Sequence, residues 1–118
     1  KMQVFGDNYD THDGTGVRDY IHVNDLATGH VQAMNHISDT NEDIVVNLAT
    51  GKGHSVLDVI NKSKEVSGKD IPFDIVGRRA GDPATVVAVS NRANKVLDWS
   101  TKYSDLDTLI RTSWDVYK

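Results

Sequence analysis

The sequence predicts a mixed α/β fold with a small mixed sheet and about four helices. Residues 17–23 alternate between apolar and polar side chains, which is the period-two pattern of a half-buried strand. Ile44–Ala49 is a short apolar run between polar segments, which is typical of a more buried strand. Between and after these runs, apolar side chains recur at three- and four-residue spacing, as in amphipathic helices. Strands and helices therefore alternate along the chain.

The first helix is expected from Asp25 to about Ser38, with Asn24 as its N-cap. Its apolar positions are Ala27, Val31, Met34 and Ile37. A second helix is expected after the strand Ile44–Ala49, because Ser55 and Asp58 form a variant of the capping box. Its apolar face comprises Val56, Val59, Ile60 and Val66, with Gly68 as its stop.

The second half of the chain should begin with a strand, Ile71–Val76, followed by a polar loop, Gly77–Pro83, and a short strand, Thr85–Val89. Two more helices should follow, one capped by Ser90 and one by Ser104 together with Asp107. Their apolar faces are Ala93, Val96 and Leu97 in the first, and Leu106, Leu109, Ile110 and Trp114 in the second.

Composition narrows the class of protein. The 118 residues suffice for one domain with a core, and 38% are hydrophobic and 25% charged, as in ordinary globular chains. A net charge of −4 argues against a nucleic-acid partner. The absence of cysteine excludes disulfides and thiolate metal sites and fits a cytoplasmic protein. Apolar runs are too short to span a bilayer, so no membrane partner is expected.

Several familiar sites are incomplete. The loop Gly51-Lys52-Gly53 resembles a phosphate cradle, but a dinucleotide fingerprint would need glycine where Val56 stands. The five histidines have no i,i+4 pair and no cysteine partner, so we expect no metal site. The acidic loop Asp7–Asp13 lacks the order of a calcium loop, and we interpret it as a solvated turn. No Ser-His-Asp constellation stands out.

The arginines are better candidates for binding. Arg18 follows a glycine-rich turn, and Arg79 lies in a glycine-bounded loop with Asp82 three residues later. A guanidinium matches phosphate oxygens, and a carboxylate accepts hydrogen bonds from sugar hydroxyls. Arg18, Arg79 and Asp82 could therefore hold a nucleoside diphosphate. The alternative is that Arg78 and Arg79 are solvated or paired with the surplus acids.

Residues 13–27, Asp-Gly-Thr-Gly-Val-Arg-Asp-Tyr-Ile-His-Val-Asn-Asp-Leu-Ala, closely resemble a segment of the UDP-galactose (UDP-glucose) 4-epimerases. These are members of the extended short-chain dehydrogenase/reductase family. Further matches follow in family order, at residues 46–53, 55–57, 78–83 and 97–99 and at Trp114, with Asp98 in place of the family's glycine.

The resemblance implies an NAD-dependent isomerase with two domains that interconverts UDP-glucose and UDP-galactose by oxidation and re-reduction at the sugar C4. Its N-terminal Rossmann domain would hold NAD through a glycine fingerprint and carry a Tyr-x-x-x-Lys pair, neither of which occurs in these 118 residues. We therefore expect residues 1–118 to be the C-terminal UDP-sugar-binding region, without the NAD-binding domain, inactive alone and with no catalytic residue.

The resemblance also implies a set of substrate-binding residues: Gln3, Val4, Phe5, Arg18, Tyr20, Arg79, Asp82 and Val86. Residues 3–5 look like the uracil segment, acting through backbone groups and a ring face. The two arginines look like pyrophosphate ligands and Asp82 like a ribose ligand, while the other reading of Tyr20 is strand packing. Val86 stands where the family varies between a bulky tyrosine and a small residue that governs room for an N-acetyl group.

Three partners follow from this reading: the UDP-sugar, the missing NAD domain and a second copy in a homodimer. The missing domain should cover Ile44–Ala49, which would complete the Rossmann sheet. Two alternatives stay open. One is another sugar-nucleotide reductase of the extended family, such as a dehydratase or decarboxylase. The other is a free-standing binding or interaction domain.

Overall fold

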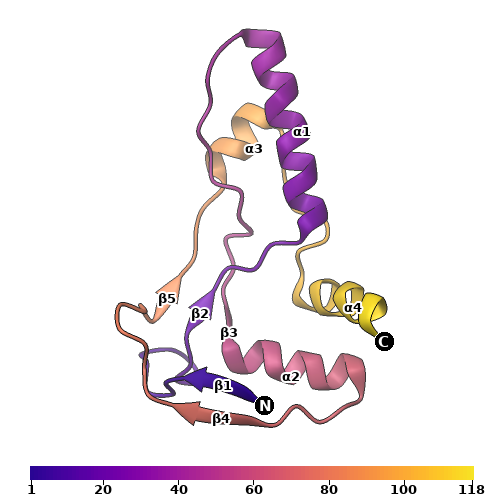
Figure 1. Ribbon diagram of the computed structural model, residues 1–118. Coiled ribbons are helices and arrows are strands. Elements are labelled where there is room, and N and C mark those ends of the chain that lie inside the picture. Colours follow the sequence, from indigo (N-terminus) through magenta and orange to yellow (C-terminus); the bar gives the residue numbers. More distant parts are fainter.

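The computed structural model describes residues 1–118, which form four helices and two small sheets (Figure 1). The helices are α1 (Val23–Thr40), α2 (Val56–Ser67), α3 (Asn91–Leu97) and α4 (Leu106–Tyr117). The strands are β1 (Met2–Phe5), β2 (Val17–Arg18), β3 (His54–Ser55), β4 (Phe73–Val76) and β5 (Thr85–Val86). The predicted α/β class with four helices is confirmed, although the sheet is divided in two.

Both sheets join segments that lie far apart in the sequence. β1 runs parallel to β4, with Met2 opposite Phe73 and Phe5 opposite Val76. In the other sheet β2 is central, antiparallel to β3 and parallel to β5. The loop from β4 to β5 therefore connects the two sheets, and it carries the predicted residues Arg79 and Asp82.

The molecule is elongated, with extents of 50 × 34 × 19 Å. α1 and α3 lie side by side at the narrow end, while α2, α4 and both sheets form the broad end (Figure 1). None of the four helices has the length and apolar character needed to cross a membrane.

The main core lies between α1 and α3. Trp99, Leu97 and Ala93 are buried there, and the partly buried hydrophobic residues packed against them are Ile21, Ala33, Ile44, Val46 and Leu48. The Trp99 indole donates hydrogen bonds to the Asp25 carbonyl at 2.9 Å and to Thr28 Oγ1 at 3.2 Å, so its one polar group is satisfied. Only 14 of the 118 residues are buried, which is a small core for a chain of this length.

The predicted strand Val17–Val23 is wrong beyond its first two residues. His22 is the N-cap of α1, because its Nδ1 accepts a hydrogen bond from the Asn24 N–H at 3.0 Å. The sequence prediction of Asn24 as the cap is therefore also wrong, and the helix extends further at both ends, from Val23 to Thr40. An imidazole can serve as the cap acceptor, which ordinary cap preferences do not anticipate.

The predicted strand Ile44–Ala49 is likewise not a strand in this chain. The segment is extended and apolar, but it joins no ladder. Ile44, Val46 and Leu48 pack on the core, whereas Val45 is 82% exposed. The segment is also less buried than the prediction of a buried strand implies, because partly buried and exposed residues alternate along it. A strand also needs a hydrogen-bonding neighbour, which these residues do not have here.

The predictions of helix caps are confirmed for α2 but not for α3 and α4. Ser55 and Asp58 form the capping box of α2, and Gly68 ends that helix in the left-handed region at φ 67°, both as predicted. Ser90 occupies the N-cap position of α3 but makes no side-chain cap hydrogen bond. The cap of α4 is Asp105, whose carboxylate accepts from the Thr108 N–H at 3.0 Å, so the Ser104 prediction is wrong.

The later strands are shorter than predicted. Ile71–Val76 forms a ladder only from Phe73, and Thr85–Val89 only through Val86. Val96 is 39% exposed and so lies outside the core of α3. The polar loop between β4 and β5 is confirmed as a loop.

Candidate functional site

The site is built around residues 13–25, which bind three later segments through their carboxylates. Asp13 accepts hydrogen bonds from Thr15 N–H at 3.0 Å and from Ser55 Oγ at 2.5 Å. Asp19 accepts from the N–H of Thr50 at 3.1 Å and of Gly51 at 3.0 Å. These two bonds fix the loop before β3 against β2. The prediction that Asp7–Asp13 is a solvated turn is therefore wrong at Asp13, and it is also wrong at Tyr9, which is only 8% exposed.

Asp25 attaches the third segment. It is 1% exposed and accepts hydrogen bonds from the N–H of Lys102 and of Tyr103, both at 3.0 Å, and from Ser104 Oγ. Ser104 Oγ in turn accepts from the His22 N–H at 2.9 Å. Burial opposes ionisation, but these hydrogen bonds outweigh it and hold the pKa of Asp25 below its ordinary value. This carboxylate is therefore a structural anion.

The acids of the motif thus hold the fold together, which leaves Arg18 as its charged candidate for a ligand. Arg18 Nη1 donates to the Val17 carbonyl at 2.8 Å, and Nη2 donates to the Pro83 carbonyl at 3.1 Å. A weaker contact joins Nη1 to the Ala84 carbonyl at 3.5 Å. Arg18 therefore contacts the end of the β4–β5 loop, at the two residues that follow Asp82.

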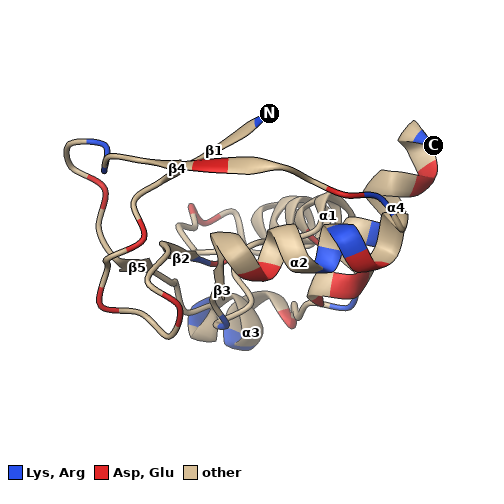
Figure 2. Cartoon of the chain, turned by 90° about the horizontal axis from the view of Figure 1, so that it is seen from below, with Lys and Arg blue, Asp and Glu red and all other residues tan.

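Arg79 pairs with Asp82 and stacks on Phe5. Arg79 Nε donates to Asp82 Oδ2 at 2.8 Å, and its guanidinium carbon lies 4.5 Å from the centre of the Phe5 ring. The Arg79 side chain is 60% exposed, so its outer nitrogens face solvent. Figure 2 shows basic residues at the turn after β4 and an acidic residue further along the loop. The structure therefore brings together three of the predicted residues from two segments.

The other predicted residues lie around this group. Gln3 is exposed on β1, whereas Val4 is only 1% exposed as a whole residue, so neither its side chain nor its backbone is open to a ligand in this structure. Val86 is 48% exposed and stands opposite Arg18 in the β2–β5 ladder. Tyr20 is half-buried; burial raises the pKa of its hydroxyl, opposed by the nearby Arg18 charge.

Arg78 was not predicted to have a role. It pairs with no acid; its Nε donates to Asn8 Oδ1 at 2.9 Å and its Nη2 donates to the Asn8 carbonyl at 2.7 Å. Its guanidinium carbon also lies 4.1 Å from the centre of the Tyr9 ring. The signal available in the sequence was an adjacent arginine pair, which does not reveal that the two side chains have different partners.

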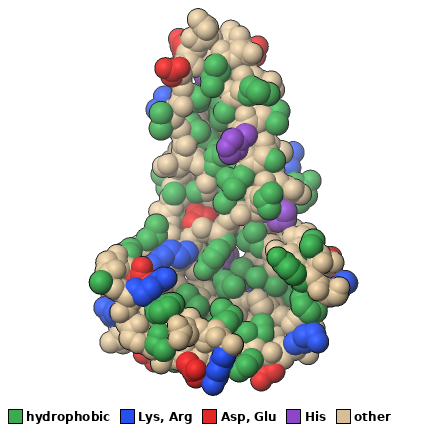
Figure 3. Space-filling model, in the orientation of Figure 1, with side chains coloured by type: hydrophobic (Ala, Val, Ile, Leu, Met, Phe, Trp, Pro, Cys, Tyr) green, Lys and Arg blue, Asp and Glu red, His purple; other side chains and the backbone are tan.

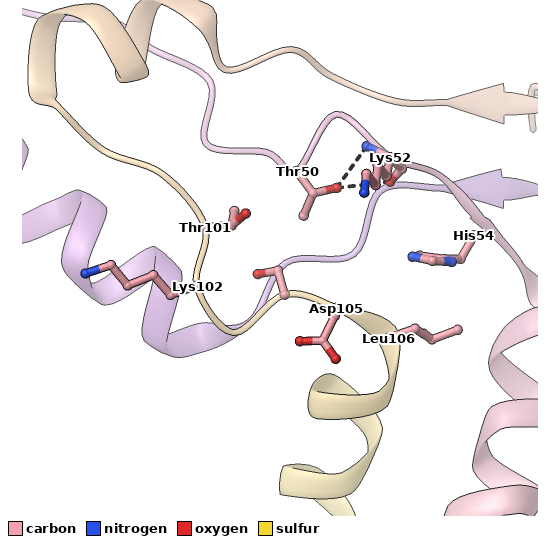
Figure 4. A pocket seen from close by; sticks show the side chains of 8 residues that line it. Thr50, Lys52, His54, Thr101, Lys102, Asp105 and Leu106 are labelled. Atoms are coloured by element: carbon pink, nitrogen blue, oxygen red, sulfur yellow. Dashed lines mark hydrogen bonds between the residues drawn. The ribbon is translucent and has the colours of Figure 1, made fainter.

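Five pockets of about 300–420 Å³ are lined by other residues. The polar one in Figure 4 lies between residues 50–54 and 101–106, and its Lys102 side chain points away from the other lining residues. None of the predicted binding residues lines one of these five pockets.

One cluster of metal-ligand types exists, formed by His12, Asp13 and Asp58. His12 Nε2 lies 3.1 Å from Asp58 Oδ2, and both carboxylates already accept hydrogen bonds from Ser55. These bonds make the cluster part of the anchor of α2.

Comparisons with known proteins find similarity to epimerases. Residues 2–49 match the model of the NAD dependent epimerase/dehydratase family. The UDP-glucose 4-epimerase of Lactobacillus helveticus is 45% identical over all 118 residues, which are 36% of its length. This chain therefore spans about a third of the length of the curated relatives that it matches.

Solved structures give the same result. The UDP-glucose-4-epimerase of Stenotrophomonas maltophila, with bound NAD and formylated UDP-arabinopyranose, is 47% identical with a TM-score of 0.93, covering 98% of this chain and 34% of that one. The enzyme of Bifidobacterium longum, in complex with NAD+ and UDP, is 44% identical with a TM-score of 0.86, covering 98% and 35%.

Proposed function

We propose that this chain is the C-terminal, UDP-sugar-binding part of a UDP-glucose 4-epimerase. The observation that carries the proposal is the meeting of Phe5, Arg79 and Asp82 beside Arg18, in a chain similar over its whole length to enzymes of that name. The alternatives of a dehydratase, a decarboxylase or a free-standing binding domain remain, but no contact in the structure favours them.

The chemistry of each group fits one part of UDP. Two of the five donors of Arg18 and the outer nitrogens of Arg79 make no hydrogen bond within the chain, so they can donate to phosphate oxygens. Asp82 can accept from ribose hydroxyls, and the Phe5 ring offers a face to the flat uracil base. These residues bind and orient UDP, so that the sugar is presented to the reacting groups.

The residues present do not fit NAD. The chain has no fingerprint of three glycines. After Gly51 and Gly53, the position that the third glycine would occupy holds Val56. The segment before that loop joins no sheet, and the two sheets have only two and three strands. In the complete enzyme the cofactor and the reacting acid and base belong to the two-thirds of the length that this chain does not span.

Val86 concerns substrate range. Its side chain is of intermediate size and half-exposed beside Arg18. We infer that the complete enzyme tolerates an N-acetyl group on the sugar. Turnover of UDP-N-acetylglucosamine by the complete enzyme tests this inference, and no turnover at high enzyme concentration would contradict it.

Calorimetric titration of the complete enzyme with UDP tests the binding assignments. Each charge-assisted contact contributes about 1.5–3 kcal/mol, so Arg18→Ala or Arg79→Ala should weaken UDP binding by about 10- to 150-fold. Arg92→Ala, at an exposed arginine of α3, is the matched control and should leave the affinity unchanged. Equal UDP affinity in the wild type and both site variants would exclude these assignments.

A further inference from the structure

The loop that carries Arg79 and Asp82 has little to hold it in place. It runs from β4 to β5 and contains Gly77 and Gly81, the latter at φ 82°. Within the loop, the Arg79–Asp82 pair joins two residues of the same loop, and Arg79 contacts another segment through its stack on the Phe5 ring. The other contacts that attach the loop come from its two ends. At the far end Arg18 holds the Pro83 carbonyl, and at the near end the contacts come from Arg78.

Arg78 attaches the near end through three contacts with residues 6–9. Its two hydrogen bonds engage both the side chain and the carbonyl of Asn8, and its guanidinium lies over the Tyr9 ring. A Cβ on Gly6 would lie 2.7 Å from Arg78 Cγ and 3.1 Å from Tyr9 Cε2, so Gly6 leaves room for this packing. Gly6 also has φ 99°, a conformation that suits glycine.

The arrangement aligns two adjacent arginines on two aromatic rings. Arg78 lies over Tyr9, and Arg79, the next residue, lies over Phe5. Phe5 and Tyr9 flank the turn that follows β1, so the position of Arg79 depends on that of Arg78. A planar guanidinium that stacks and donates two directed hydrogen bonds fixes orientation in a way that an ammonium group does not.

From these contacts we propose that Arg78 is a positioning residue for UDP binding, which acts through Asn8 and Tyr9 to hold Arg79 and Asp82 in their binding geometry. The proposal rests on the function proposed above. In this assignment Arg78 acts through Asn8, which accepts from its Nε and Nη2, and not through a contact of its own with the ligand.

Kinetics and UDP titration of the complete enzyme test the proposal. Losing the stack and two charge-assisted hydrogen bonds should raise the KM for UDP-glucose and the Kd for UDP about tenfold in Arg78→Ala, with kcat little changed. Arg78→Lys should be nearly as impaired, because lysine restores the charge but not the planar geometry. Tyr9→Leu should resemble Arg78→Ala. Tyr9→Phe should behave as wild type, because the buried Tyr9 hydroxyl has no hydrogen-bond partner.

The outcomes separate three readings. Full rescue of UDP affinity by Arg78→Lys would show a charge effect and overturn the proposal. Lower thermal stability of Arg78→Ala with unchanged Kd for UDP would show a role in folding alone and also overturn it. Arg79→Ala belongs in the same series: if it weakens UDP binding while Arg78→Ala does not, only the positioning role fails. If neither variant weakens UDP binding, the proposed function fails first.

Discussion

At the scale of single residues, the three carboxylates of residues 13–25 stabilise the fold, although aspartate is exposed to solvent in most proteins. Asp13 and Asp25 each receive several hydrogen bonds, and Asp19 receives bonds from two successive backbone N–H groups. For Asp13 and Asp25, burial opposes ionisation, yet the donated hydrogen bonds keep both pKa values below the ordinary value. Residues 13–25 resemble a ligand-binding motif, but most of their charged side chains stabilise the fold, and only Arg18 is a candidate for ligand binding.

Asp25→Asn is expected to lower the free energy of unfolding by about 3 kcal/mol, because the amide cannot accept all three hydrogen bonds and its NH₂ faces donors. Urea denaturation at pH 7 measures this. Asp70→Asn, at an 86% exposed carboxylate, is the control and should change stability by less than about 0.5 kcal/mol. Equal losses in the two variants would contradict the structural role of Asp25.

The same carboxylate predicts a pH dependence. Its folded pKa lies below the unfolded value of 3.8, so its contribution is complete above that pH and is lost as the pH falls through the folded pKa. The contribution of Asp25 to the stability of the wild type should therefore be independent of pH near neutrality and decline below about pH 4. Asp25→Asn should show a shallower decline. A parallel decline in wild type and variant would show that Asp25 does not carry it.

At the scale of elements, the sequence predicted local structure well where local chemistry decides it. The capping box and the αL glycine of α2 need only residues within one turn, and both were predicted correctly. The caps of α1 and α4 were mispredicted although both cap hydrogen bonds are local: an imidazole caps α1, and Asp105 caps α4. Ser104, the cap predicted for α4, instead bonds to His22 and Asp25, 82 and 79 residues away. The strand Ile44–Ala49 was mispredicted because pairing depends on a neighbour.

The candidate site divides in the same way. The charge and ring chemistry of Arg18, Arg79 and Asp82 could be identified from residue types and family resemblance. The contact of Arg18 with the loop comes from the pairing of β2 with β5. The different ring partners of Arg78 and Arg79 come from the pairing of β1 with β4. Spacing in the sequence encodes neither pairing.

The two serines at predicted caps provide a direct test at this scale. Ser55→Ala removes the cap of α2 and a hydrogen bond to Asp13, so unfolding free energy should fall by about 1–2 kcal/mol. Ser90→Ala should change it by less than about 0.5 kcal/mol, because Ser90 makes no side-chain cap hydrogen bond. Denaturation curves of both variants measure the difference. A Ser90→Ala loss as large as that of Ser55→Ala would mean that α3 depends on a cap that the structure lacks.

At the scale of the whole molecule, the chain exposes more surface than a self-contained domain. Its accessible area is 7725 Å², whereas a compact 13.0 kDa protein would expose about 6300 Å². Its radius of gyration is 16.8 Å, against about 13.5 Å for a compact chain of this length. Exposed apolar side chains gather along α1 and the neighbouring extended segments, at Val31, Met34, Ile37, Val45 and Val89, and Figure 3 shows hydrophobic side chains over this narrow end. The difference in accessible area is comparable with the area that one partner buries in a protein–protein interface.

The proposed placement in a longer enzyme predicts a difference between two valines that are equally exposed here. Val45 is 82% exposed beside the unpaired segment, and Val116 is 80% exposed near the end of α4. If the rest of the enzyme covers residues 44–49, Val45→Asp in the complete enzyme places a charge in an apolar interface and should lower its stability by about 3 kcal/mol or more. Val116→Asp should lower it by less than about 0.5 kcal/mol. Thermal denaturation of the two variants side by side measures both effects, and equal melting temperatures would show that the segment stays open and that the chain does not dock through it.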